Sequence, residues 1–234
     1  MRLETVQDFV GGLSGLDFPD VFNPYRDICS EFDLAEAADI RCENLGSVLE
    51  AALRRRVGAI WIGRDLGFRG GRRTGLALTD EQHLIACADM MGCRPLHRAT
   101  RGATIGEPTA TAVWTALAGA RAAVFLWNVF PLHPHEEGKA LTNMPHRRAE
   151  ADACRPYLEW LFDRVAPRHV VAIGRDAYTT LARIGIDATP VRHPSYGGKT
   201  VFLSSLGHPV DTKANHGAGR YAGGDFKARR LHER

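Results

Sequence analysis

The chain has 234 residues, of which 44% are hydrophobic and 24% are charged, and this composition excludes a disordered, fibrous or disulfide-stapled protein. The formal net charge is +3, which by itself is too small to indicate a nucleic-acid partner. The charge is unevenly distributed: residues 1–40 hold nine acidic and two basic residues, so they carry −7 and the remaining residues carry +10.

The N-terminus lacks a basic segment followed by an apolar run, and no apolar stretch approaches the ~20 residues of a membrane span. We therefore expect a soluble cytoplasmic enzyme that does not bind membranes. The cysteines form no C-x-x-C pair, which favours reduced thiols. An iron–sulfur cluster would need four of the five to converge: Cys29, Cys42, Cys87, Cys93 and Cys154.

Along the chain, residues 1–30 contain glycine and proline breakers. Two helical pieces are predicted next, at residues 33–38 and 47–56, with Ser47 as the N-cap of the second. Short apolar runs rich in β-branched residues follow, and they predict buried parallel strands at residues 57–63, 122–128 and 168–174. A fourth strand, at residues 189–192, contains a proline and is expected at a sheet edge.

Helical patterns separate these strands, at residues 79–91, 109–120, 147–165 and 176–184. Pro156 lies early in the third pattern, where we expect a break and a new first turn. The alternation predicts an α/β fold, a three-layer α/β/α sandwich with a central, mostly parallel sheet of about four strands. We expect a single domain over residues 1–214 and a basic, Gly-rich, flexible tail over residues 215–234; the slightly longer segment 213–234 carries +4.

Polar residues follow three of the predicted strands, at the sheet edge where open parallel sheets bind ligands. Asp65 stands two residues past the first strand, in a stretch rich in glycine and arginine. Asn128 ends the second strand, and His193 opens a His-Pro-Ser segment after the fourth. Each also has a plainer interpretation: a carboxylate that caps a turn, an amide that satisfies nearby backbone, and a proline turn.

Taken together and in order, these segments resemble the motifs of the uracil-DNA glycosylase superfamily. The resemblance covers residues 57–200, and no known branch of the superfamily is assigned. The matching segments are Gly63-Arg64-Asp65, Gly75-Leu76-Ala77-Leu78, Asn128 and His193-Pro194-Ser195.

The resemblance implies a monofunctional DNA repair hydrolase that flips uracil, or a related damaged base, out of DNA and leaves an abasic site. Asp65 would orient the attacking water and stabilise the cationic sugar, while His193 would donate to uracil O2. Asn128 would read the O4 and N3–H edge. The other residues assigned to the base pocket are Gly63, Arg64, Gly67, Phe68, Leu78 and Phe130. The residues assigned to DNA binding are Arg69, Arg72, Arg73, Pro194, Ser195, Tyr196, Gly197 and Lys199.

The expected partners are uracil-containing or abasic DNA and uracil as the product, with the protein acting as a monomer and, in a bacterium, near the nucleoid. We expect no cofactor and no metal ion. The acidic first 40 residues contain no motif position, so we expect them to cover the face away from DNA.

The chain departs from the family pattern at three positions. Leu78 stands where relatives carry an aromatic residue that stacks on the base, so Phe68, Phe130 or Trp127 would have to compensate, with Phe68 or Phe130 favoured. Gly67 stands where some relatives carry a tyrosine that excludes thymine, which leaves uracil, mismatched thymine and hypoxanthine as alternatives. Tyr196 is the candidate wedge into the duplex, where the best-known branch has a leucine.

Other functions remain open from the sequence. A protein of the same fold could bind damaged or abasic DNA with weak or no catalysis. A serine hydrolase has no G-x-S-x-G motif to support it, and the G-x-G-x-x-A match at residues 217–222 has no preceding strand to support a nucleotide cofactor. A metal hydrolase could take its ligands from a histidine-rich stretch otherwise expected to be a solvated loop: His133, His135, Glu136, Glu137 and His146.

Overall fold

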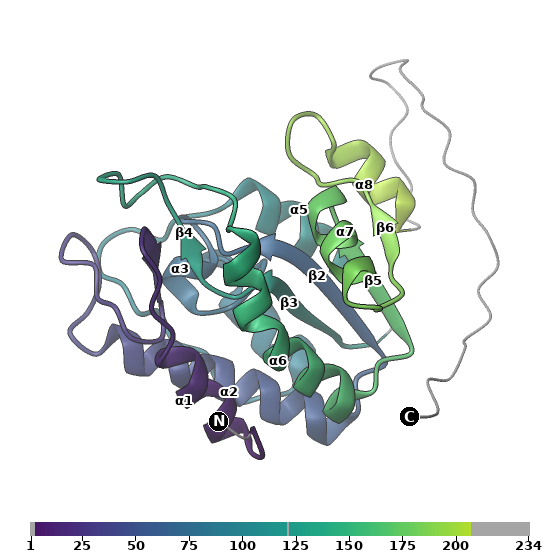
Figure 1. Cartoon of the computed structure of the whole chain (residues 1–234), viewed down its shortest axis with the longest axis horizontal. Coiled ribbons are helices and arrows are strands. Elements are labelled where there is room, and N and C mark those ends of the chain that lie inside the picture. The colour runs from purple at the N-terminus through teal and green to yellow at the C-terminus, as the bar shows by residue number, and fades with distance from the viewer. Residues whose placement is uncertain (1–2, 121, 207–234) are drawn as a thin grey trace.

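The computed structural model describes residues 3–120 and 122–206, and it confirms the predicted three-layer α/β/α sandwich (Figure 1). All four strands of the central sheet run parallel, and their spatial order is β3-β2-β5-β6. The strands are β2 (Ala59–Asp65), β3 (Val124–Phe130), β5 (His169–Ile173) and β6 (Thr189–Val191). The predicted tail and the G-x-G-x-x-A match lie outside the described residues.

The sheet is apolar because both of its faces are covered, as parallel sheets require. Every residue of β3 is buried. The ring of Trp127 lies 5.5 Å from that of Phe9 on one face, whereas Leu126 faces the other. Strands β2 and β3 are two residues longer at their carboxyl ends than the sequence predicts, because the pairing of the two strands continues to Asp65 and Phe130.

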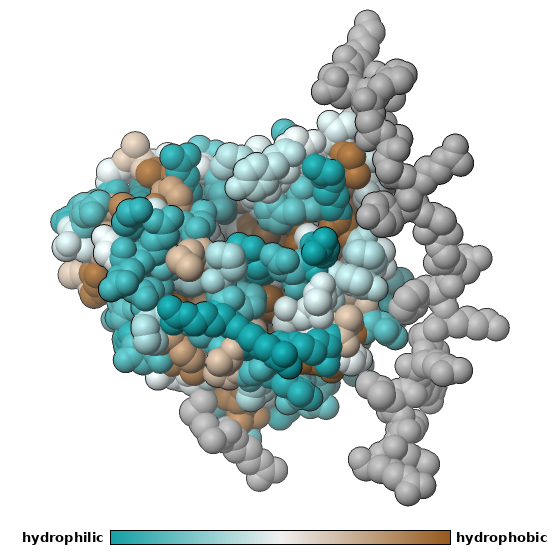
Figure 2. Space-filling model, turned by 45° about the horizontal axis from the view of Figure 1, so that its top comes forward, coloured by the Kyte–Doolittle hydropathy of each residue, from teal (hydrophilic) through white to brown (hydrophobic). Residues whose placement is uncertain are grey.

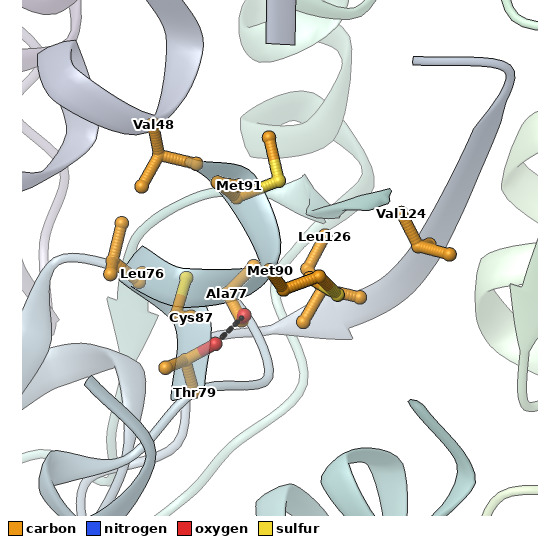
Figure 3. A pocket seen from close by; sticks show the side chains of 9 residues that line it. All are labelled: Val48, Leu76, Ala77, Thr79, Cys87, Met90, Met91, Val124 and Leu126. Carbon is orange, nitrogen blue, oxygen red and sulfur yellow. Dashed lines mark hydrogen bonds between the residues drawn. The ribbon is translucent and has the colours of Figure 1, made fainter. Parts of the chain in front are cut away.

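Helices cover the two faces in the pattern that right-handed crossovers produce. One face carries α4 (Leu84–Met91), α5 (Pro108–Leu117) and α8 (Lys199–Ser205). In front of the other face, in the view of Figure 1, lie α6 (Arg148–Val165) and α7 (Arg175–Arg183), and α1 (Val6–Ser14) packs beside α6. Beneath α4 is a small apolar cavity of about 10 Å³, into which Met90, Leu126 and Cys87 point (Figure 3).

Three details of the helices differ from the prediction. The two predicted pieces at residues 33–56 form one helix, α2 (Ala37–Arg55), and Ser47 is buried in its middle instead of capping its start. Helix α6 continues through Pro156, because Pro156 and Asp152 are on the exposed side, where water can satisfy the freed carbonyl. The predicted helix at residues 79–91 is a 3₁₀ turn, η1 (Glu81–His83), followed by α4.

The sequence did not predict the short elements outside the sheet. Strand β1 (Val21–Phe22) pairs antiparallel with β4 (His133–Pro134), and α3 (Gly71–Thr74) lies within the loop after β2. The β1–β4 pair joins the N-terminal segment to the chain that leaves the carboxyl end of β3. It therefore lies at the edge of the sheet where ligands are expected.

Candidate active site

Asp65 is the last residue of β2, and its carboxylate is held at both oxygens. Nε of Arg64 donates to Oδ2 over 2.5 Å, and Nδ1 of His146 contacts Oδ1. Only 6% of the Asp65 side chain is exposed. Arg64 also pairs with Asp176 in the first turn of α7, with 2.8 Å between Nη1 and Oδ2. This chain of contacts ties the ends of β2 and β5 together.

Asn128 lies inside β3, two residues before its end, and not at the strand end predicted from the sequence. Its side chain is fully buried. Among the described residues, neither Nδ2 nor Oδ1 of Asn128 has a hydrogen-bond partner. A buried amide without partners is costly, so one that persists in a fold calls for an explanation such as a ligand site. The amide offers one donor and one acceptor to a planar ligand.

Gly63 lies opposite Asn128 in the β2–β3 register and leaves room for the amide. A Cβ atom at residue 63 would stand 2.5 Å from Oδ1 of Asn128 and 3.1 Å from the side chain of Leu78. Any other residue here would therefore displace the amide. Leu78 is buried and has a positive φ of 54°, an uncommon conformation for a residue with a side chain.

His193 follows β6 and packs against Gly174 at the end of β5. The backbone N–H of Ser195 donates to Nδ1 of His193 over 3.2 Å, so Nδ1 is an acceptor and a neutral ring carries its proton on Nε2. The hydroxyl of Ser195 lies 2.7 Å from the same nitrogen. Burial lowers the pKa of His193, and Arg64 lowers it further, against an opposing effect of Asp176. The site therefore holds a neutral imidazole whose Nε2–H donates to no other residue in the described part of the chain.

The loop after β2 contains two glycines that accommodate a carboxylate. Cβ atoms at Gly67 and Gly70 would approach the carboxylate oxygens of Glu107 to 2.2 and 2.1 Å. Burial raises the pKa of Glu107 to about 7, with a further contribution from Asp80, while Arg69 acts in the opposite direction. Nothing in the sequence marks Glu107, because this contact depends on how a distant loop folds back.

Arg72 and Arg73, which the sequence analysis assigns to DNA phosphates, are buried in the free protein. Their relative exposures are 2% and 4%. The Arg72 guanidinium lies 3.7 Å from the Phe22 ring centroid and donates to the carbonyl of Ala140 over 2.7 Å. Arg73 pairs with Glu81. In the free protein both arginines are thus paired with protein groups, and their assignment to DNA phosphates stays a prediction.

Phe130, which is predicted to stack on a base, packs against other aromatic rings in the free protein, and its role in stacking stays a prediction. It is fully buried, with its ring 5.8 Å from Phe18 and 5.4 Å from His146. Trp127 points to the opposite face of the sheet from Asn128, because neighbouring residues of a strand alternate. Of the aromatic residues considered as base-stacking candidates, Phe68 is the one that is not fully buried.

The histidine-rich stretch after β3 is used structurally. His133 is buried, contrary to the expectation of a solvated loop, and its Nδ1 accepts from Arg72 while Nε2 donates to the carbonyl of Thr142. Burial lowers the pKa of His133 to about 3, and Arg72 contributes further. His146 contacts Asp65. In the described part of the chain, no group of three or more potential ligands is arranged to hold a metal ion.

The His-Pro-Ser segment leads into an exposed turn. Pro194 is buried, and Tyr196 is 98% exposed with a φ of 50°. Gly197 has a φ of 73°, and Lys199, at the start of α8, is exposed. The assignment of this turn and of the exposed Arg69 to DNA stays a prediction.

The N-terminal segment, which we expect to cover the face away from DNA, contacts two of the loops around the site. The carbonyl of Asp20 accepts from the backbone N–H of His135 over 2.9 Å, and the hydroxyl of Tyr25 donates to the carbonyl of Gly75. The acidic segment thus packs against the loops that carry the site. Its position follows from the β1–β4 pairing, which the sequence does not reveal.

The surface around these loops is mostly hydrophilic, with scattered apolar residues (Figure 2), so it suits a polar partner. A hollow of about 500 Å³ lies elsewhere, between α4 and α5, and is lined by His83 and Trp114 and not by Asp65, Asn128 or His193. None of the helices described in the structure is long and apolar enough to cross a membrane.

Comparisons with known proteins gave a match to a family model and a match in fold. The family model described as the uracil DNA glycosylase superfamily matches residues 58–206, which is more than half of the chain. A crystal structure of wild-type SMUG2 from Pedobacter heparinus is similar in fold, with a TM-score of 0.52 and 13% sequence identity, covering 87% of this chain and 95% of that one. A search of curated proteins found no match.

Proposed function

Because this chain belongs to the uracil-DNA glycosylase superfamily, we propose that it hydrolyses the N-glycosidic bond of uracil in DNA and leaves an abasic site. The observation that carries this proposal is the buried amide of Asn128, which has no partner among the described residues. Its oxygen can accept from N3–H of uracil while its nitrogen donates to O4. Cytosine presents the opposite pattern at these positions, so binding it would leave buried polar groups unpaired.

The two neighbouring polar residues complete the proposed chemistry. Loss of uracil leaves positive charge on the sugar, and the carboxylate of Asp65 stabilises that charge while it orients the attacking water. The electron pair of the bond from C1′ to the base nitrogen leaves with uracil, the water oxygen then bonds to C1′, and the proton that the water loses passes to the Asp65 carboxylate and from there to solvent. The negative charge that develops on uracil O2 receives a hydrogen bond from Nε2–H of His193, which needs no proton transfer.

We propose that exposed residues at the same edge contact the DNA. Arg69 and Lys199 supply positive charge for phosphates, and Ser195 lies beside His193. Tyr196, which is almost completely exposed, is available to insert where the base has left the duplex. In this proposal the protein acts as a monomer and needs no cofactor.

An excision assay tests the proposal directly. Single-stranded and duplex oligonucleotides that contain uracil, mismatched thymine or hypoxanthine are incubated with the protein and then cleaved at abasic sites with alkali. We expect cleavage at uracil. Asp65→Asn and His193→Ala should each lower the rate by at least ~10²-fold, while Asp163→Asn, on the exposed surface of α6, should match the wild type.

The control for binding uses the same oligonucleotides. Asp65→Asn should bind uracil-containing DNA about as tightly as the wild type, since the carboxylate acts on the transition state. No cleavage of any base at stoichiometric protein would overturn the proposed activity. Tight binding of abasic DNA in that case would favour the alternative, a damage-binding protein of the same fold.

A further inference from the structure

His146 contacts the carboxylate of Asp65 from a segment 81 residues away in the sequence. An ionised carboxylate can only accept hydrogen bonds, so Nδ1 of His146 carries the proton and donates it to Oδ1. Arg64 donates to the other oxygen. Both oxygens of Asp65 are thus fixed by side chains from different parts of the fold, and the carboxylate cannot rotate without breaking one contact.

The position of His146 is itself well determined. It lies two residues before the first residue of α6, and only 8% of its side chain is exposed. Its ring packs 5.4 Å from the ring of Phe130, at an interplanar angle of 38°. Phe130 follows Asn128 by two residues on the same face of β3. His146 therefore packs on the strand that carries the proposed base-reading amide.

The same segment supports the loop after β2 at a second point. The side-chain oxygen of Asn143 accepts from the backbone N–H of Phe68 over 3.0 Å. The segment between β4 and α6 therefore contacts both the end of β2, through His146, and the loop beyond it, through Asn143. These contacts point to a support for the reacting groups, and none of them serves a metal ion.

We propose that His146 is the positioning residue that sets the orientation of the Asp65 carboxylate. This inference rests on the proposed glycosylase function and deepens it. A misplacement of about 1 Å at a reacting group can cost about 10²-fold in rate. Loss of the His146 donor therefore lowers the rate of bond cleavage, whereas DNA binding, which relies on other residues, stays nearly unchanged.

Three variants separate the hydrogen bond from packing. His146→Asn keeps a donor near the position of Nδ1, and His146→Phe keeps a ring against Phe130 without the donor. His135→Phe, on the same segment, is the matched control because His135 contacts a backbone carbonyl and not Asp65. In single-turnover excision of uracil, we expect the maximal rate of His146→Phe to fall about 10–100-fold, with the half-saturating protein concentration within about twofold of the wild type.

His146→Asn should recover to within about fivefold of the wild type, and His135→Phe should not differ from it. Equal losses in His146→Asn and His146→Phe, or a His146→Phe rate within twofold of the wild type, would overturn the inference. A rise in the half-saturating protein concentration with an unchanged maximal rate would also contradict it, because that result places His146 in DNA binding.

A readout that needs no catalysis separates this inference from the proposed function. The nitrogen chemical shifts of the His146 ring in the full-length protein report which nitrogen carries the proton. We expect the Nδ1–H tautomer in the wild type and a shift toward Nε2–H in Asp65→Ala. A wild type with the Nε2–H tautomer would refute the contact even if uracil is excised. An inactive wild type with the Nδ1–H tautomer would instead refute the activity alone.

Discussion

Replacement of Asn128 by leucine should make the protein more stable and less active. Leucine branches at the same carbon as asparagine, and Gly63, which lies opposite residue 128 on β2, is apolar. The substitution removes a buried amide whose two polar atoms have no partner among the described residues. The free protein therefore loses no hydrogen bond with another described residue.

The size of both effects follows from the same contacts. A buried polar group without a partner costs about 1–3 kcal/mol, so the free energy of unfolding should rise by about that amount. For a chain of this size, the melting temperature should increase by about 2–12 °C. Uracil leaves as an anion, and two hydrogen bonds to it of about 1.5–3 kcal/mol each give a total near 3–6 kcal/mol. Excision should slow by about 10²–10⁴-fold.

Asn44 provides the matched control. It is also a buried asparagine, but its amide donates to the carbonyls of Thr74 and His97 and accepts from the N–H of His97. Asn44→Leu should therefore lower the free energy of unfolding, by about 1–3 kcal/mol or more, because it orphans backbone groups. Thermal or urea unfolding should show a gain of stability in Asn128→Leu and a loss in Asn44→Leu. Uracil excision is measured on the same two variants.

The reasoning fails if Asn128→Leu is destabilised as much as Asn44→Leu, since the Asn128 amide would then be paired in the free protein. Excision by Asn128→Leu within fivefold of the wild type would refute the role of the amide in reading the base.

Three further outcomes follow from the structure. Burial raises the pKa of Glu107 from 4.5 to about 7, so ionisation of this group lowers stability as the pH rises from about 4.5 to 7. Glu107→Gln should therefore change the free energy of unfolding little at pH 5 and raise it by an amount on the order of 2 kcal/mol at pH 8. Urea unfolding at each pH measures both values. Asp33→Asn leaves the fully buried guanidinium of Arg41 without its anion and should lower the free energy of unfolding by about 3–5 kcal/mol, which an unchanged melting temperature would contradict. Tyr196→Ala should slow excision from duplex DNA about tenfold while leaving single-stranded DNA unaffected, and equal effects on both would argue against a wedge.

The sequence predicted the layers and the four parallel strands well, because buried parallel strands are short, apolar and β-branched. It placed the ends of β2 and β3 two residues too early, since Asp65 is polar and reads as loop. Pairing with Phe130 keeps it in the strand. The polar residues Asp65, Asn128 and His193 could be found from the sequence because each lies at or near the carboxyl end of a strand or just after it.

The surroundings of these residues could not be found in the same way. Arg72 reads as an exposed cation in a Gly-rich loop, yet it lies over Phe22, a residue fifty positions earlier. His146 reads as a potential metal ligand, yet it contacts Asp65 across 81 residues. Both outcomes depend on long-range contacts, and neither leaves a local pattern in composition or periodicity.

The pairing of β1 with β4 has a consequence for synthesis of the chain. Phe22 is made about 110 residues before its partner His133. At about 5–20 residues per second, the N-terminal segment waits roughly 5–20 s for the strand that receives it. Contacts of such long range form late, because the intervening chain must be ordered first. The acidic segment, although made before the strands of the sheet, would be among the last parts of this domain to dock, and the loops that it contacts would become fixed only at that moment.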